Sequence, residues 1–275
     1  MSRILVKGLL AGIATSLVAV MIPSGASAAK NIGKTFVPET ACAGGHTFLQ
    51  TSFPGRQYEA PSPGVITSWR HRASVSPPQL KLKVGRPVTG NDYRIIGESG
   101  VVTPVAGEPN TYPVSIRVRE GDVLGLYAAT TGDCGSLAGG AFRDSYVNED
   151  APVGETRTFT PGEGLKLDIS AGFKPYRCAG QDADLAGTNG PDVLVGTPGT
   201  DVIVGLGGAD RIKGLGGNDR ICGGNGRDRL RGQRGNDILK GSKGRDKLNG
   251  GGGTDTCAGG PGDDTARKCE VERSI

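Results

Sequence analysis

Aspartates recur at a strict spacing of nine residues through the last third of the chain, and they are its strongest candidates for chemistry. Carboxylates held side by side repel each other unless a cation lies between them. Calcium suits such a position because it accepts about six to eight oxygens in flexible geometry, whereas magnesium demands a tighter octahedron. We therefore predict calcium ligands at Asp192, Asp201, Asp210, Asp219, Asp228, Asp237, Asp246, Asp255 and Asp264.

Glycines keep the same register as the aspartates. One glycine opens each unit and another follows three residues later, so each unit contains a turn with backbone conformations closed to other residues. Carbonyl oxygens in these turns would complete a calcium shell. The opening glycines that we take as further candidate ligands are Gly196, Gly205, Gly214, Gly223, Gly232 and Gly241.

The elements that must position these groups follow from the rest of each unit. An apolar residue comes two residues after most aspartates: Leu194, Ile203, Ile212, Ile221, Leu230, Leu239 and Leu248. The last three residues of a unit are expected to form a short strand whose middle, apolar side chain faces a thin core. Two units would make one turn of a right-handed coil with a sheet on each side. Each aspartate would then lie about 4.8 Å from the one two units along.

Such a core is too small to offset the loss of chain entropy, so we expect metal binding to supply the folding free energy. Without calcium, the expected state is a disordered glycine-rich segment. The outward strand positions carry Arg211, Lys213, Arg220, Arg229, Arg231, Lys240 and Lys247. From Cys178 onward, fourteen basic residues balance fourteen acidic ones, and the net charge of the whole chain is only +4, so we predict no nucleic-acid partner.

The unit resembles the G-G-x-G-x-D-x-U-x nonapeptide of the RTX, or haemolysin-type, calcium-binding repeat family. The resemblance covers residues 187–267 and implies a parallel β-roll with calcium ions between the turns. It departs from the family pattern at the second glycine, present only as Gly224, Gly251 and Gly260, which leaves the conformation of the other turns open.

The resemblance also implies two disulfide bridges, because similar secreted proteins carry cysteines at matching positions. These bridges are Cys178–Cys222 and Cys257–Cys269. A third bridge, Cys42–Cys134, is expected to join the start of the N-terminal domain to one of its late loops. Leu185 falls in the register of the apolar positions, so an aspartate-free cap unit is expected before the array.

The first 28 residues have the features of a secretory signal peptide. Arg3 and Lys7 precede an uncharged run from Gly8 to Ile22, and Ala26-Ser27-Ala28 offers small residues for cleavage after Ala28. A retained membrane anchor is the alternative, and no other segment is apolar enough for a stable span. An even number of cysteines suits a secreted chain with disulfides, and the lack of C-x-x-C spacing with only two histidines argues against zinc.

Residues 29–175 are predicted to form an antiparallel β-sandwich, and residues 178–275 to form the roll. The expected fold class of the whole chain is therefore all-β. The predicted strands are Val65–Trp69, Leu80–Val84, Tyr93–Ile96, Val114–Arg119 and Leu165–Ile169. The region resembles jelly-roll-like modules found ahead of such arrays in secreted bacterial proteins. Trp69 is expected in the core, with sugar stacking as the alternative. Arg70, His71 and Arg72 are expected at a solvated strand end rather than in an anion site.

No enzyme motif is found, since both H-E-x-x-H and G-x-S-x-G are absent. A secreted hydrolase, which would have to use His46, His71 or Ser99, is therefore the least favoured hypothesis. We predict a secreted, monomeric calcium-binding protein without enzymatic activity, in a structural or surface-interaction role. The alternative is a carbohydrate or cell-surface binding module that the calcium-loaded roll stabilises.

Overall fold

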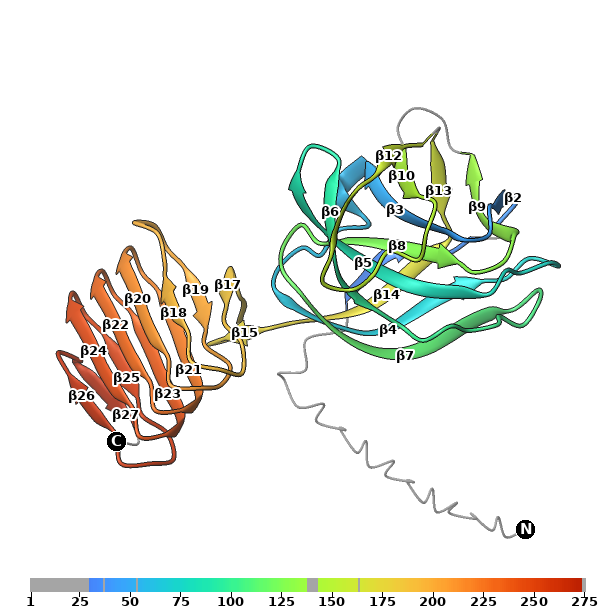
Figure 1. The fold of residues 1–275 in the computed structure, drawn as a ribbon. Helices are drawn as coiled ribbons and strands as arrows, with labels where there is room; N and C mark the ends of the chain where they lie inside the picture. The colour runs from blue at the N-terminus through green and yellow to red at the C-terminus, as the bar shows by residue number, and fades with distance from the viewer. Residues whose placement is uncertain (1–29, 37, 53, 138–142, 163, 274–275) are drawn as a thin grey trace, which may run out of the picture.

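The computed structural model describes residues 30–273 apart from 37, 53, 138–142 and 163 (Figure 1). The described chain is almost entirely β-structure, and its only helical element is the 3-10 turn η1 (Pro54–Arg56). Within these residues no helix has the length and apolar character needed to cross a membrane. The signal-peptide features, including Arg3, Lys7 and Ala28, lie outside the described residues.

Two large antiparallel sheets form the first part of the chain, and a small third sheet adjoins them. In spatial order, the first sheet consists of β1 (Lys30–Lys34), β14 (Ile169–Pro175), β4 (Gly64–Arg72) and β7 (Pro109–Val118). The second consists of β11 (Thr156–Thr158), β6 (Asp92–Glu98), β5 (Leu80–Thr89), β8 (Val123–Ala128), β3 (His46–Ser52), β10 (Arg143–Val147) and β12 (Thr160–Pro161). The third consists of β13 (Leu165–Leu167), β9 (Gly132–Leu137) and β2 (Thr40–Cys42).

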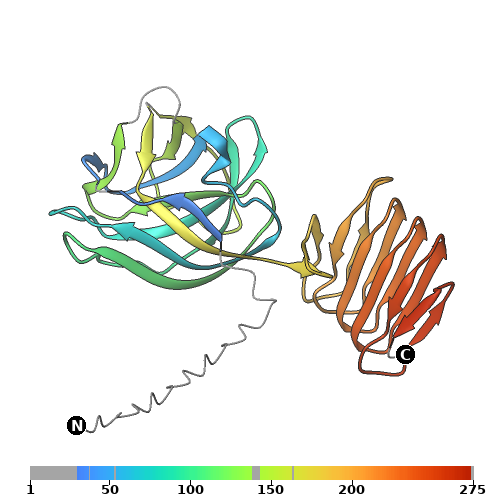
Figure 2. The same ribbon diagram turned by 180° about the vertical axis from the view of Figure 1, so that it is seen from behind.

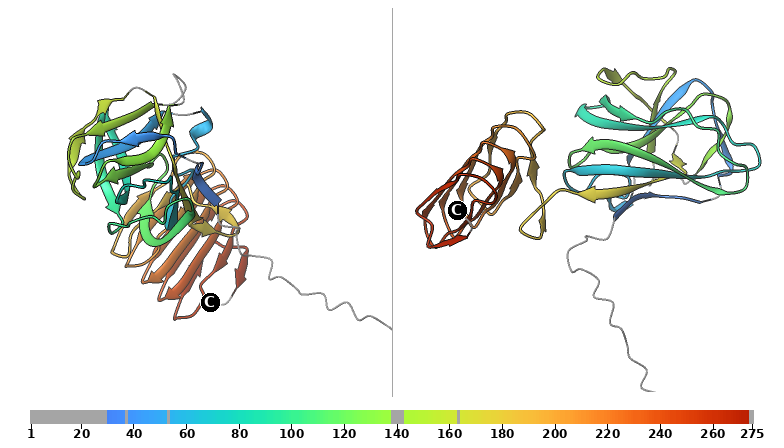
Figure 3. Two further views of the ribbon diagram at one scale, coloured as in Figure 1. Left: turned by 90° about the vertical axis from the view of Figure 1, so that its right-hand side faces the viewer. Right: turned by 90° about the horizontal axis from the view of Figure 1, so that it is seen from below.

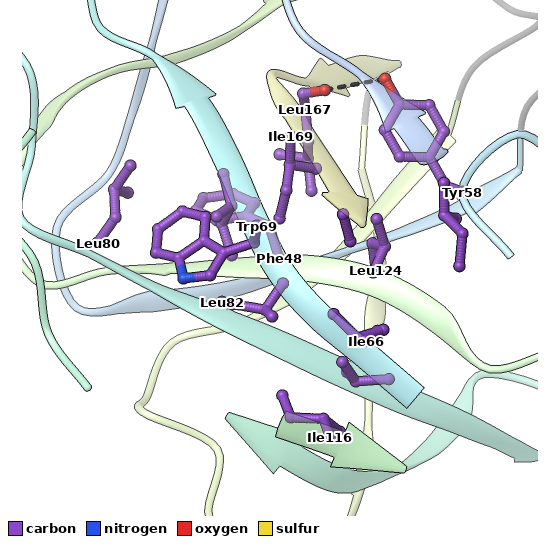
Figure 4. Packing of buried hydrophobic residues seen from close by; sticks show 14 of the residues in the cluster. Phe48, Tyr58, Ile66, Trp69, Leu80, Leu82, Ile116, Leu124, Leu167 and Ile169 are labelled. Atoms are coloured by element: carbon purple, nitrogen blue, oxygen red, sulfur yellow. Dashed lines mark hydrogen bonds between the residues drawn. The ribbon is translucent and has the colours of Figure 1, made fainter. Parts of the chain in front are cut away.

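The main core lies between the two large sheets, as a sandwich requires (Figure 4). Ile66 and Trp69 enter it from β4, and Leu80 and Leu82 enter it from β5. Trp69 has no solvent exposure. The prediction that Trp69 is a core residue is confirmed, and the alternative of sugar stacking on it is wrong.

The predicted strand Leu165–Ile169 is wrong as a single element, because the chain changes sheets at Asp168. β13 ends at Leu167, and β14 begins at Ile169 in another sheet. The Asp168 carboxylate is buried and accepts hydrogen bonds from the backbone N–H groups of Phe36 and Arg72. The local alternation of polar and apolar residues in Leu165–Ile169 could not reveal these distant partners.

A parallel β-roll makes up the second part of the chain, with strands stacked side by side in two layers (Figures 2 and 3). One sheet consists of β17 (Leu185–Ala186), β19 (Val202–Val204), β21 (Arg220–Gly226), β23 (Ile238–Gly244), β25 (Thr256–Ala258) and β27 (Val271–Arg273). The other consists of β18 (Val193–Val195), β20 (Arg211–Gly216), β22 (Arg229–Arg234), β24 (Lys247–Gly252) and β26 (Thr265–Arg267).

Each strand of the roll pairs with the strand two units along. Ile203 faces Ile221, and Ile212 faces Leu230, so the apolar residues of each layer form a continuous row. These side chains are buried between the layers, together with Cys257. The nine-residue period therefore set the register correctly, because a slip by one residue would have turned every apolar side chain outward.

The turns resolve the question raised by the missing second glycines. Leu206, Leu215, Gln233 and Ser242 occupy that position with φ between 76° and 86°, in the left-handed region that Gly224 also adopts. In these four units the turn conformation is thus kept without glycine, at a cost of about 1–2 kcal/mol per residue. Thr188 and Thr197, at the same position of the first two units, do not adopt a positive φ. Turn residues also pair between neighbouring strands of one sheet, such as Leu215 with Gln233, which lengthens the central strands beyond the three residues expected.

A short hairpin of β15 (Arg177–Cys178) and β16 (Gln181–Asp182) caps the beginning of the roll. It packs on Val202 and Val204, whose side chains would otherwise be exposed on the outer face of β19. Leu185 pairs with Ile203, as expected for a cap unit. All three implied disulfides are present: Cys42–Cys134, Cys178–Cys222 and Cys257–Cys269.

Candidate metal-binding turns

The repeated aspartates form two ladders, one along each row of turns. In each ladder the backbone N–H of one aspartate donates to Oδ1 of the aspartate eighteen residues later. The bond from Asp219 N to Asp237 Oδ1, for example, is 2.8 Å long. One ladder contains Asp192, Asp210, Asp228, Asp246 and Asp264. The other contains Asp201, Asp219, Asp237 and Asp255.

The second carboxylate oxygen has no hydrogen-bond donor in seven of these nine aspartates. The seven buried, unpartnered Oδ2 atoms belong to Asp210, Asp219, Asp228, Asp237, Asp246, Asp255 and Asp264. A buried charged oxygen without a partner is strongly unfavourable. A regular series of such atoms, one per turn, is therefore the arrangement expected of a site that is completed by cations.

The opening glycine of each unit makes room for these oxygens. A Cβ built on Gly214 would lie 1.9 Å from Asp219 Oδ2 and 2.9 Å from the carbonyl oxygen of Gly232, so no larger residue fits. The same pair of oxygens meets a Cβ on Gly205, namely Asp210 Oδ2 at 2.5 Å and the Gly223 carbonyl at 2.3 Å. A carboxylate and a carbonyl oxygen therefore converge beside most of the opening glycines. Two acceptors attract each other only through a shared cation or donor.

The chemistry of this donor set fits calcium. Among the residues that the structure describes, no three histidine, cysteine, aspartate or glutamate side chains gather into a metal-binding group. Each turn thus offers one carboxylate, and backbone carbonyls must supply other ligands. An all-oxygen set of this kind suits Ca²⁺ and leaves out the nitrogen and sulfur ligands that zinc prefers.

The electrostatics of the ladders also favour a bound cation. Burial is the largest effect and raises the pKa of Asp219 and Asp228 to about 6, and neighbouring aspartates in the ladder add to it. Burial likewise raises the pKa of Asp210, Asp237, Asp246 and Asp255. The backbone N–H that each Oδ1 accepts opposes the shift. The surroundings of these carboxylates therefore disfavour the ionised form, which a bound cation would stabilise.

The first two units differ from the others. Asp192 Oδ2 accepts the backbone N–H of Thr188, and Asp201 Oδ2 accepts that of Thr197, with each threonine hydroxyl nearby. These two predicted ligands are thus already partnered. Of the predicted glycine ligands, five have a carbonyl oxygen that lies with an aspartate Oδ2 beside the opening glycine two units earlier: Gly205, Gly214, Gly223, Gly232 and Gly241. Gly196 has no opening glycine two units before it, because residue 178 is a cysteine.

Sequence reasoning missed the residues that end the ladders. Glu270 accepts the backbone N–H of Asp255, the bond that an aspartate of a further unit would accept. Asp184 accepts the backbone N–H of Val202 at the other end. Asp184 lies one residue after the nine-residue register and Glu270 lies outside it, so the repeat offered no signal for either residue.

The candidate enzyme residues do not form a catalytic group with one another. His71 is buried, with Nδ1 3.0 Å from Asp168 Oδ2, while Arg70 and Arg72 are exposed. The Ser99 hydroxyl bonds to the backbone of Leu82 and Gly100. His46 Nδ1 contacts the carbonyl of Gly44. Each of these polar groups has a structural role in the sandwich.

Comparison with known proteins gives one match. The family model described as RTX calcium-binding nonapeptide repeat (4 copies) matches residues 182–205, 195–230 and 231–266. No curated protein and no solved structure matches the chain. The matched residues include every turn of the two ladders.

Proposed function

Residues 182–266 of this chain are RTX calcium-binding nonapeptide repeats, and from them we propose that the protein is a secreted structural protein whose roll folds when it binds Ca²⁺. Repeats of this kind bind calcium. The observation that carries the proposal is the series of seven buried Oδ2 atoms, each facing the bare Cα of an opening glycine.

Calcium binding is coupled to folding because the roll has little else to hold it together. Each repeat strand contributes one apolar side chain to the core, and seven of the nine ladder aspartates are buried close to other carboxylates of their ladder. The apolar contribution is small, and the charge repulsion opposes it. The free energy of calcium binding then supplies what folding lacks.

We further propose that the chain divides near Pro175 into a sandwich domain and the roll, and that it is exported by its N-terminal signal sequence. Three disulfides support an oxidising compartment, where calcium is also abundant. We assign the protein no enzymatic activity, because its two histidines and Ser99 serve backbone and side-chain contacts of the sandwich.

Hydrogen exchange of the disulfide-intact chain tests the proposal. Calcium is expected to protect amides of residues 185–267 strongly, and to leave those of the sandwich strands unchanged as an internal reference. Asp219→Asn keeps the shape of the side chain but removes its charge, so it should raise the calcium concentration needed for protection. Asp192→Asn is the matched control, and should have a much smaller effect because Thr188 already satisfies Asp192 Oδ2.

Two results would contradict the proposal. One is protection of residues 185–267 that is equally strong after calcium has been removed. The other is a chain that stays unprotected at millimolar calcium with all disulfides intact, since the array would then be a disordered glycine-rich segment.

A further inference from the structure

One outer face of the roll carries two straight rows of cations. On the sheet of β18, β20, β22, β24 and β26, Arg211, Arg229 and Lys247 pair in sequence across neighbouring strands. Two residues further along the same strands, Lys213 pairs with Arg231, and Arg267 follows after Asn249. We call these six exposed residues the basic face: Arg211, Lys213, Arg229, Arg231, Lys247 and Arg267. Neighbours within a row are about 4.8 Å apart by strand spacing.

No carboxylate of the described chain forms an ion pair with any residue of the basic face; the roll's ion pairs involve its cap residue Asp182. A shallow depression over β22, β24 and β26 adds Arg227 and Arg245 to the basic face, and Asp246 and Asp263 are the carboxylates that line it. Since Asp246 belongs to a ladder, the bound calcium would neutralise it. The basic face therefore has a strong, uncompensated positive potential in the calcium-loaded roll.

The opposite face of the roll is different. On the outer positions of β19, β21, β23 and β25, the described cations are Arg220 and Lys240, and the other positions include Ile238, Thr256 and Ala258. Charges needed only for solubility, or only to balance the ladder aspartates, would be shared by both faces. Their concentration on one sheet indicates a surface that meets a partner.

We propose that the basic face binds an acidic polysaccharide, a linear chain with carboxylate or sulfate groups along its length. Straight rows of cations match a polymer with regularly repeated anions. Arginine is well suited to this role because its planar fork binds carboxylate or sulfate oxygens in pairs. A flat sheet contacts only one side of a bound polymer. The affinity must therefore come from many contacts along the chain rather than from enclosure in a pocket.

Features of the face argue against a nucleic acid as its partner. Residues 178–275 contain no phenylalanine, tyrosine or tryptophan, and so offer no side chain on which bases of a single strand could stack. The sheet is flat and has no helix that could enter the major groove of duplex DNA. A sulfated or uronic-acid polymer requires neither feature.

The inference rests on the proposed calcium-folded roll, because the rows exist only when the strands stack. Calcium should therefore switch polysaccharide binding on. By linkage, the polysaccharide should also lower the calcium concentration at which the roll folds. Export to a calcium-rich medium would then activate the binding surface.

The test uses the full disulfide-bonded chain, two polymers with the same backbone, dextran sulfate and uncharged dextran, and duplex DNA as a competing polyanion. Titration calorimetry is run at fixed ionic strength, with and without calcium, and far-UV circular dichroism follows roll folding in the same samples. The variant Arg229→Thr/Arg231→Thr removes two central cations while threonine suits a strand. The control Lys240→Thr/Lys243→Ser removes the same charge from β23 of the opposite sheet.

We expect calcium-dependent binding of dextran sulfate only. Loss of two face cations should weaken it by about tenfold or more, because each basic residue near an anionic surface adds to the attraction. The control should stay within about twofold of the unaltered chain. Equal loss in both variants, or tighter binding of duplex DNA than of dextran sulfate, would overturn the inference. Failure of the roll to fold with calcium would instead contradict the proposed function, which the dichroism detects separately.

Discussion

At the scale of single residues, the fourth position of each repeat is the most demanding. Gly244 has a φ of 141°, and a Cβ on it would lie 1.5 Å from the carbonyl oxygen of Gly226 in the adjacent strand β21. An alanine at this position would have to adopt a left-handed backbone conformation, which costs about 1–2 kcal/mol. Its methyl group would also clash with the carbonyl, which costs about 1–3 kcal/mol more. Gly190 holds the same position in the first unit, but its Cβ would meet no atom closer than 3.7 Å.

We therefore expect Gly244→Ala to destabilise the calcium-loaded roll by roughly 3 kcal/mol, in sum of those two costs. Gly190→Ala should change stability by less than about 1 kcal/mol. Urea unfolding at saturating calcium, followed by far-UV circular dichroism, compares the two. Similar losses in both variants would show that the close approach of neighbouring turns does not govern stability.

The buried aspartates also make the metal-free roll sensitive to pH. The pKa of Asp219 and Asp228 is raised to about 6 in the fold, from 3.8 for an unperturbed aspartate. Between these values the folded roll holds more protons than the unfolded chain does. Its free energy of unfolding therefore falls as pH rises from about 4 to 6 and is lowest above that range.

In calcium-free buffer we thus expect β-structure of the roll to increase as the pH is lowered from 7 to about 4, because protons replace the missing cations. Far-UV circular dichroism measures this change. Fluorescence of Trp69, the chain's single tryptophan, reports on the sandwich alone and serves as the reference. A loss of β-signal on acidification while Trp69 fluorescence is constant would show the opposite sign and contradict this account.

At the scale of elements, β5 shows how far a strand pattern can mislead. Leu80, Leu82 and Val84 face the main core, so the alternation places Lys83 on the solvent side, yet Lys83 has no exposure. The chain around Ala151 and Phe159 covers that side of the sheet and forms a second small core. Lys83 Nζ lies beneath this cover, bonded to Glu98, 2.5 Å from Asp150 Oδ1 and 2.8 Å from the carbonyl of Ala151.

Removal of this buried cation should destabilise the sandwich. Lys83→Met retains the volume but leaves Glu98 and Asp150 with Lys81 as their remaining partner. Loss of one partner from a buried ion pair costs about 3–5 kcal/mol, and the partial exposure of both carboxylates should reduce this to about 1–3 kcal/mol. Lys81→Met, at a more exposed position of the same cluster, should cost less.

Urea unfolding monitored by Trp69 fluorescence measures both variants, and the calcium midpoint of the roll should remain constant. An equal cost for the two lysines would mean that burial of Lys83 adds nothing to the sandwich.

The strict period made the roll more predictable than the sandwich. Ile203 and Ile221 could be placed in one row from their spacing alone, because every unit repeats the same local choice. The chain change at Asp168 and the burial of Lys83 depend on residues more than sixty positions away, which no local pattern reports. In the same way, the aspartates of the turns were found from the repeat, whereas Glu270, which ends one ladder, belongs to no unit.

At the scale of the whole molecule, the cap joins the non-repeating part of the chain to the roll. Cys178 lies in the cap and Cys222 in β21, so their disulfide closes a sequence separation of 44 residues across the first coil turns of the roll. The cap also covers Val202 and Val204 and binds Lys30 of β1 through Asp182. In a solenoid each repeat contacts only its two neighbours, so a repeat at either end has one neighbour fewer. The ends therefore unfold first unless they are capped.

Replacement of both cysteines, as Cys178→Ala/Cys222→Ala, should destabilise the calcium-loaded roll by about 2–4 kcal/mol, because the unfolded chain gains the freedom that the closed loop removed. The loss should appear in hydrogen exchange as weaker protection of residues 185–204, with protection near Leu239 less affected. Cys257→Ala/Cys269→Ala opens a separation of only 12 residues at the other end and is the matched control. If exchange instead increased uniformly along the roll in the first variant, the repeats would unfold as one cooperative unit. The bridge would then stabilise the whole roll rather than its first coil turns.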